Sequence, residues 1–242
     1  WVYTFENVRD ITMAMKNQLS LIFSDGLKYN RIISTPKYAI LNSNICEAAM
    51  RTVIEQPYAW EYKFLAYVLK DEFEKLQKDK WDFKYGFFEG TTYCYTSEKL
   101  VDDISEKLNE ILELVNFINI IINSTLQDAI GKPGEPSDLE MIVYTAKRLS
   151  STYKRMVSWA LYFKAVHADD MFSDLLELLY ELPGSVLKTM DDFVDRVYKE
   201  ITALPDVETG HSYHIELNCT LDVANTPKII EEIERLTSIL KI

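Results

Sequence analysis

The stretch that decides the fold is residues 101–122, which read VDDISEKLNEILELVNFINIII. Its apolar side chains recur at alternating intervals of three and four residues, which places them along one face of an α-helix. These positions are Val101, Ile104, Leu108, Ile111, Val115, Ile118 and Ile122. We predict a helix over 98–130, which would be about 50 Å long at 1.5 Å per residue.

A second apolar stripe follows the loop Gly131–Ser137, which reads GKPGEPS. Ser137 and Glu140 fit a capping box that opens the next helix. The stripe, again spaced by three and four, is Leu139, Ile142, Ala146, Leu149, Tyr153, Met156, Ala160 and Phe163. Two such stripes joined by a short loop predict a long antiparallel helical hairpin over about 98–166.

Two segments outside this hairpin alternate with the period of a β-strand. In residues 81–96 the aromatic residues Phe83, Tyr85 and Phe87 alternate before a Glu89-Gly90 turn, which predicts a β-hairpin. Residues 211–223 alternate apolar and polar side chains throughout, which predicts a long half-buried strand paired with that hairpin. We therefore expect a small antiparallel β-element.

Helical patterns occupy most of the remaining chain. One helix is expected over 5–24, with Val8, Ile11, Met15, Leu19 and Ile22 on one face, and the last is expected from Thr226 to about 240. No long flexible linker divides the 242 residues. We predict a mainly α fold in a single domain over 1–242: an elongated helical bundle built around the 98–166 hairpin.

Composition restricts the function classes. The chain has 26 basic and 38 acidic residues and a net charge of −12, which disfavours binding to nucleic acid. Cys46, Cys94 and Cys219 form no disulfide framework and no zinc motif, which favours a reducing, cytoplasmic setting. No run approaches the roughly 20 apolar residues that span a bilayer, so we expect no membrane span.

Aspartates are the sharpest candidates for chemistry. Asp170 and Asp174 lie on one predicted helix, and Asp191 and Asp195 lie on the next. Carboxylates that converge from two directions are the ligands Mg²⁺ prefers, so these pairs raise the alternative of a Mg²⁺-dependent enzyme for a phosphorylated or diphosphate substrate. The competing interpretation places the same residues on solvated faces of acidic helices, with no cofactor.

A basic cluster lies on the second helix of the hairpin. It consists of Lys147, Arg148, Lys154 and Arg155. Such residues can bind a phosphate or an acidic partner, or they can balance the charge of the acidic residues in 98–113.

The predicted strand over 211–223 offers a weaker candidate. His214 and Glu216 share its polar face and could contribute to a metal site, but an exposed polar sheet face with no metal is the preferred interpretation.

The abundance of apolar stripes, set against few catalytic groups, favours a non-enzymatic interaction or regulatory module. We expect it to bind itself, as a homodimer, and to serve as a surface for another protein. The predicted interface is the edge of the 211–223 strand, the stripe on 98–130, or both.

Overall fold

The computed structural model describes residues 7–33, 45–132, 135–208, 210, 213, 215, 219–221 and 225–240. Its helices are α1 (Val8–Ile33), α2 (Glu47–Glu55), α3 (Trp60–Glu74), α4 (Gln77–Tyr85), α5 (Ser97–Ile120), η2 (Ile121–Thr125), α6 (Leu126–Ile130), α7 (Leu139–Ala165), η3 (Asp170–Phe172), α8 (Ser173–Glu181), α9 (Gly184–Thr202) and α10 (Thr226–Leu240). Two short strands, β1 (Tyr93–Cys94) and β2 (Val166–His167), accompany them. The fold is mainly α, as the sequence predicts.

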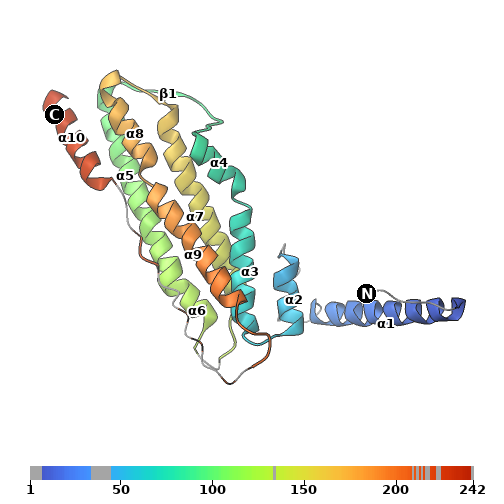
Figure 1. The fold of residues 1–242 in the computed structure, drawn as a ribbon. Helices are drawn as coiled ribbons and strands as arrows, with labels where there is room; N and C mark the ends of the chain where they lie inside the picture. The colour runs from blue at the N-terminus through green and yellow to red at the C-terminus, as the bar shows by residue number, and fades with distance from the viewer. Residues whose placement is uncertain are drawn as a thin grey trace.

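The described helices form an elongated bundle whose columns run up, down, up and down along the chain (Figure 1). The columns are α3–α4, then α5–η2–α6, then α7, then α8–α9. The long hairpin is confirmed, because α7 returns along both α5 and α6. Helix α10 lies outside the columns beside α5 and α8, and α2 lies against α3 on the other side (Figure 1).

Helix α7 is the centre of the bundle. Every position of its predicted stripe is buried, and so are residues on its other faces, including Val143, Thr145, Thr152 and Trp159. Sixteen of its 27 residues are buried, because α3, α4, α5 and α8 all pack against it. One face of α7 stays in solvent and carries Tyr144, Lys147, Ser151 and Lys154.

The first helix of the hairpin contains one local deviation. Residues Ile121–Thr125 form a π-helical turn between α5 and α6, in which the Thr125 hydroxyl lies 3.5 Å from the Ile120 carbonyl oxygen. One extra residue per turn shifts the phase of the helix, and Ile118, Ile121 and Ile122 are all buried around this point. The predicted stripe therefore continues into α6 with a changed phase.

The start of α7 differs from the predicted capping box by one residue. Asp138 is the N-cap, and its side chain accepts a 3.0 Å hydrogen bond from the Met141 amide. The Ser137 hydroxyl instead donates to the Ile130 carbonyl at 2.7 Å, and the Ser137 amide donates to Glu61 at 3.0 Å. Ser137 thus fixes the loop between α6 and α7 to both helical columns beside it.

The predicted β-hairpin over 81–96 is wrong. Residues up to Tyr85 belong to α4, and Gly86 ends that helix with a φ of 66°, a conformation that glycine adopts without a steric penalty. Trp81, Tyr85 and Phe87 are all exposed, so the alternation of aromatic residues marks no buried sheet face.

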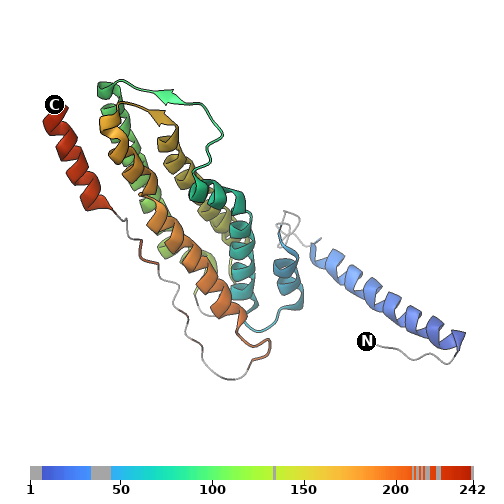
Figure 2. The same cartoon turned by 45° about the horizontal axis from the view of Figure 1, so that its top comes forward.

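The β-element is parallel, not antiparallel. β1 pairs with β2 in a register that places Tyr93 beside Val166 and Cys94 beside His167. The two strands lie side by side at one end of the bundle, where the chain crosses from α4 to α5 and from α7 to α8 (Figure 2). Most of the predicted strand over 211–223 lies outside the described residues, and its described members, Tyr213, Ile215 and 219–221, are not in a strand.

Helix α1 is longer than predicted, because it continues through Asp25-Gly26 to Ile33. It extends away from the bundle and contacts it through α2 (Figures 1 and 2). None of the helices in the described part of the chain combines the length and apolar character needed to cross a membrane.

Candidate functional site

The aspartates of α9 face lysines across the bundle. Asp195 Oδ1 lies 2.9 Å from Lys70 Nζ on α3, and Asp191 Oδ1 lies 2.6 Å from Lys80 Nζ on α4. Each carboxylate therefore has a cation as its partner, which joins α9 to the α3–α4 column.

The other candidate aspartates occupy a different part of the bundle. Asp170 begins η3 and Asp174 lies in the first turn of α8; both are exposed, and Asp174 raises the pKa of Arg235 on α10 together with the nearer Glu232. Among the described residues, no group of three or more His, Cys, Asp or Glu side chains is placed to hold a metal ion. The structure does not bring the four aspartates together.

Asp191 belongs to a polar network between helices. The Tyr153 hydroxyl on α7 donates to Asp191 Oδ2 at 3.2 Å, and Lys80 Nζ lies 5.7 Å from the ring centroids of Tyr153 and Phe73. Burial, followed by the charge of Asp191, raises the pKa of Tyr153 well above its ordinary value. A phenol held in its neutral form is a poor base or nucleophile, so this network has the character of a tether between α4, α7 and α9.

A second carboxylate–tyrosine network joins α5 to α7. The Tyr162 hydroxyl donates to Asp103 Oδ2 at 2.6 Å, and the hydroxyls of Tyr162 and Tyr95 are 2.8 Å apart. Nearby, the Trp159 indole N–H donates to the Lys107 carbonyl at 2.8 Å. Sequence reasoning missed this network, because no local spacing connects residues that are 59 positions apart.

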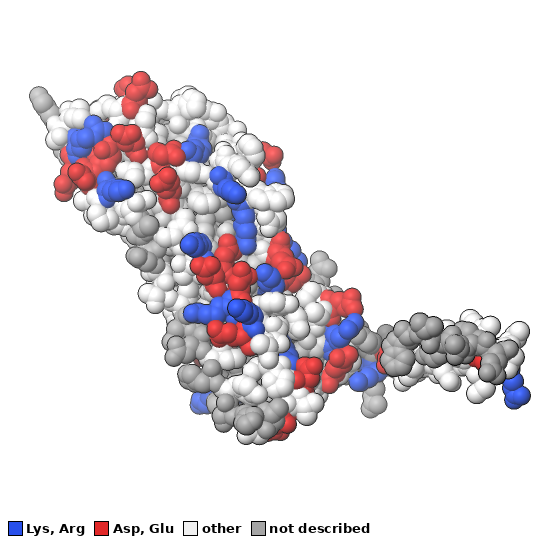
Figure 3. Space-filling view, in the orientation of Figure 1, with Lys and Arg blue, Asp and Glu red and all other residues white. Residues whose placement is uncertain are grey.

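The basic cluster on α7 divides into two pairs. Arg155 lies 3.5 Å from Glu110 on α5, and the Arg148 guanidinium lies 5.1 Å from the Phe117 ring centroid. Lys147 and Lys154 are exposed and form no ion pair with another described residue. Basic and acidic side chains also intermingle over the visible face of the bundle (Figure 3). Arg155, which faces Glu110, fits the charge-balance interpretation, whereas Arg148 contacts an uncharged ring.

The histidine candidates give no described site. His214 and Glu216 lie outside the described residues. His167 and Cys94 are neighbours across the β1–β2 pair, which sequence spacing did not indicate, and both are exposed. No hydrogen bond joins their side chains in the described structure, so they do not form a nucleophile–base pair.

An apolar surface is exposed on α1. Its large apolar side chains are exposed along the helix: Val8, Ile11, Met13, Met15, Leu19, Leu21, Ile22, Phe23 and Leu27. We call the subset Val8, Ile11, Met15, Leu19 and Ile22 the α1 stripe. Soluble monomers rarely expose apolar side chains in such a continuous group, and groups of this kind mark interaction surfaces.

Comparison with protein-family models, with curated proteins and with solved structures finds no match to this chain. Its function is therefore inferred from its own residues.

Proposed function

We propose that this protein is a non-catalytic interaction module that self-associates as a twofold homodimer through the α1 stripe. The observation that carries the proposal is the exposure of the stripe on α1, whose main contact with the described part of the chain is with α2. In this proposal the four-column bundle is the rigid body, α1 is the docking element, and binding of a further protein to the dimer gives the module a regulatory role.

The stripe is geometrically suited to helix pairing. Its members are spaced by three, four, four and three residues, an average close to the 3.6 residues of a helical turn, so they stay on one face of a straight helix. The helix has 26 residues and is about 39 Å long at 1.5 Å per residue. In a twofold arrangement each copy supplies the apolar surface that the other lacks.

Charge favours a second copy of the chain over a lipid surface. α1 contains four basic residues and two acidic residues, a net charge of +2, whereas the whole chain has −12; the remaining residues therefore carry −14. Anionic lipid headgroups would repel that acidic body. In a twofold dimer the acidic body of one copy instead attracts the basic α1 of the other, which offsets the repulsion between the two α1 helices.

The polar candidates support a non-catalytic role. Asp191 and Asp195 are paired with lysines, and the tyrosines beside Asp191 and Asp103 have raised pKa values that keep them protonated. The described cysteines, Cys46, Cys94 and Cys219, are free thiols, which fits the proposed cytoplasmic setting.

Sedimentation of the full chain at micromolar concentration tests the proposal. We expect a particle of twice 28.2 kDa. The double variant Leu19→Lys, Ile22→Asp places two charges in the stripe and should give the monomer. The matched variant Asn17→Lys, Ser24→Asp carries the same charges on the opposite face and should remain dimeric.

Three outcomes would overturn the proposal. They are a wild-type monomer at high concentration, a dimer that survives both double variants, and a monomer whose α1 stripe is required for cosedimentation with vesicles of neutral and anionic phospholipid. The last outcome would assign the stripe to a membrane surface. Circular dichroism of each variant shows whether the bundle is intact.

A further inference from the structure

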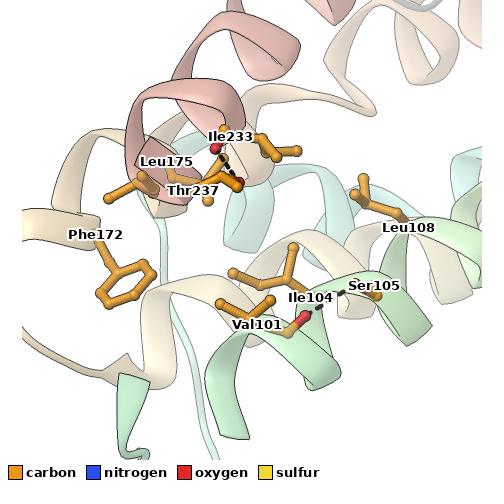
Figure 4. A pocket seen from close by; sticks show the side chains of 9 residues that line it. Val101, Ile104, Ser105, Leu108, Phe172, Leu175, Ile233 and Thr237 are labelled. Carbon is orange, nitrogen blue, oxygen red and sulfur yellow. Dashed lines mark hydrogen bonds between the residues drawn. The ribbon is translucent and has the colours of Figure 1, made fainter. Parts of the chain in front are cut away.

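The feature that carries a further inference is an apolar slot between α5 and α10. It consists of two cavities of about 80 and 200 Å³, and both are lined by Leu108 of α5 and Ile233 of α10. The side chains of α5 and α10 point into the space between the two helices, and Phe172 of η3 lies at one side (Figure 4). The lining residues extend from Val101 to Val115 of α5, about 21 Å along the helix.

Among the described residues, the hydroxyls that line the slot have partners within the protein. Those of Ser105 and Thr237 donate to carbonyls of their own helices, at 2.9 and 2.8 Å, and Thr226 also has a partner. Water in a protein cavity needs two to four polar partners, so water is a poor occupant here. A cavity of about 150 Å³ with a hydrocarbon lining is large enough to bind benzene, so the larger of the two cavities can hold part of a hydrocarbon chain.

Helix α10 covers the slot only in part. Ile229 and Leu236 are its buried apolar side chains, whereas Ile230, which lines the larger cavity, is 52% exposed. The Arg235 guanidinium donates to the Met171 carbonyl at 3.0 Å, which fixes α10 to η3. The slot is therefore bounded by a helix that packs against α8 and η3 and leaves Ile230 exposed beside α5.

Formal charge around the slot selects the kind of ligand. α5 carries six acidic and two basic residues, the η3–α8 segment carries four acidic residues and no basic one, and α10 carries three acidic and two basic residues. Arg235 is already paired with Glu232. An anionic head group would meet like charges on all three elements, whereas a neutral or cationic one would not.

We infer that the slot between α5 and α10 binds the hydrocarbon chain of a single-chain amphiphile whose head group is neutral or cationic. The chain fills the two cavities end to end past Leu108 and Ile233, and the head group stays in solvent beside the acidic helices. This site is separate from the α1 stripe, so it does not depend on the proposed self-association.

Three probes with the same twelve-carbon chain test the inference: dodecyl maltoside, dodecyltrimethylammonium and dodecanoate. Each is titrated into the full chain by calorimetry, below the concentration at which it forms micelles. We expect one saturable site for the neutral and cationic probes and at least about tenfold weaker binding of dodecanoate at low salt. No saturable binding of the first two, or tighter binding of dodecanoate, would overturn the inference.

Variants locate the site. Ile233→Trp and, independently, Leu108→Phe fill the slot and should each weaken binding of dodecyl maltoside at least tenfold. Ile239→Trp is the matched control, since Ile239 is 52% exposed on α10 and does not line either cavity. Melting curves show which variants are folded. Wild-type affinity in a folded Ile233→Trp or Leu108→Phe protein would show that the amphiphile binds elsewhere, including on the α1 stripe, and the inference would fail.

Discussion

Tyr162 on α7 donates a 2.6 Å hydrogen bond to Asp103 on α5, and this bond joins the two arms of the long hairpin near its open end. Tyr95, next to β1, adds its hydroxyl 2.8 Å from that of Tyr162. A similar bond joins Tyr153 of α7 to Asp191 of α9. The central helix is thus connected to two neighbouring columns by tyrosine–carboxylate pairs as well as by apolar packing.

The first prediction concerns the pH dependence of stability. Burial, and then the hydrogen bond to Asp103, raise the pKa of Tyr162 above its ordinary value near 10. The folded state therefore keeps the phenolic proton when the unfolded chain loses it. This contribution is complete below about pH 10 and is lost as the pH rises further.

Urea denaturation of wild type and Tyr162→Phe between pH 8 and 11 checks this. The free energy of unfolding should fall less steeply above pH 10 in the variant. Tyr144→Phe is the control, because Tyr144 is exposed on the same helix. Equal slopes in wild type and Tyr162→Phe would contradict the prediction.

The second prediction concerns the hairpin interface. Ile111→Asp or Met156→Asp places an unpaired charge at a position that is 3% or 0% exposed, and should reduce the free energy of unfolding by about 3–5 kcal/mol. Ile120→Asp changes an exposed residue of α5 and should cost less than about 1 kcal/mol. Chemical denaturation measures all three. Similar losses for Ile111→Asp and Ile120→Asp would show that burial does not distinguish the two faces.

The third prediction concerns metal. Because Asp191 and Asp195 are paired with Lys80 and Lys70, millimolar Mg²⁺ should leave the melting temperature unchanged. Asp191→Asn removes the charge that faces Lys80 and should cost about 1–2 kcal/mol with or without Mg²⁺, whereas Asp192→Asn changes an exposed residue and should cost little. If Mg²⁺ raised the wild-type melting temperature and Asp191→Asn abolished the effect, the aspartates would have to be reassigned as metal ligands.

The fourth prediction concerns a buried lysine. The Lys63 side chain is only 5% exposed, and its Nζ lies 2.6 Å from Asp206 Oδ1 and 3.3 Å from the Pro205 carbonyl. Asp206→Ala leaves the buried ammonium without its counter-charge. Because the Asp206 side chain is 82% exposed, solvent screens the pair, and the substitution should cost about 1 kcal/mol. Lys63→Met removes the charge as well and should cost less. Greater loss in Lys63→Met than in Asp206→Ala, measured by urea denaturation, would contradict this.

The sequence by itself determined the helical class and the long hairpin. The three-and-four spacing on 98–130 and 138–166 needs only the geometry of one helix, and the Gly131–Ser137 loop needs only local turn chemistry. Ile104, Ile111 and Ile118 are accordingly buried. The stripe on α5 is covered within the chain by α7 and α10. The proposed self-association therefore uses the exposed stripe on α1.

Only the tertiary structure decided which segments pack against each other and which charged side chains form ion pairs. Phe83 and Tyr85 alternate as in a strand, yet they lie in α4, where Tyr180 packs against Phe83 and Gly86 ends the helix. Asp191 was a candidate metal ligand in the sequence. In the structure its carboxylate lies 2.6 Å from Lys80, which is 111 residues earlier in the chain, so the two form an ion pair. Periodicity in the sequence shows which residues share a face of one helix or strand. The partner of a charge, and how much of a helix is buried, depend on segments that are far apart in the sequence.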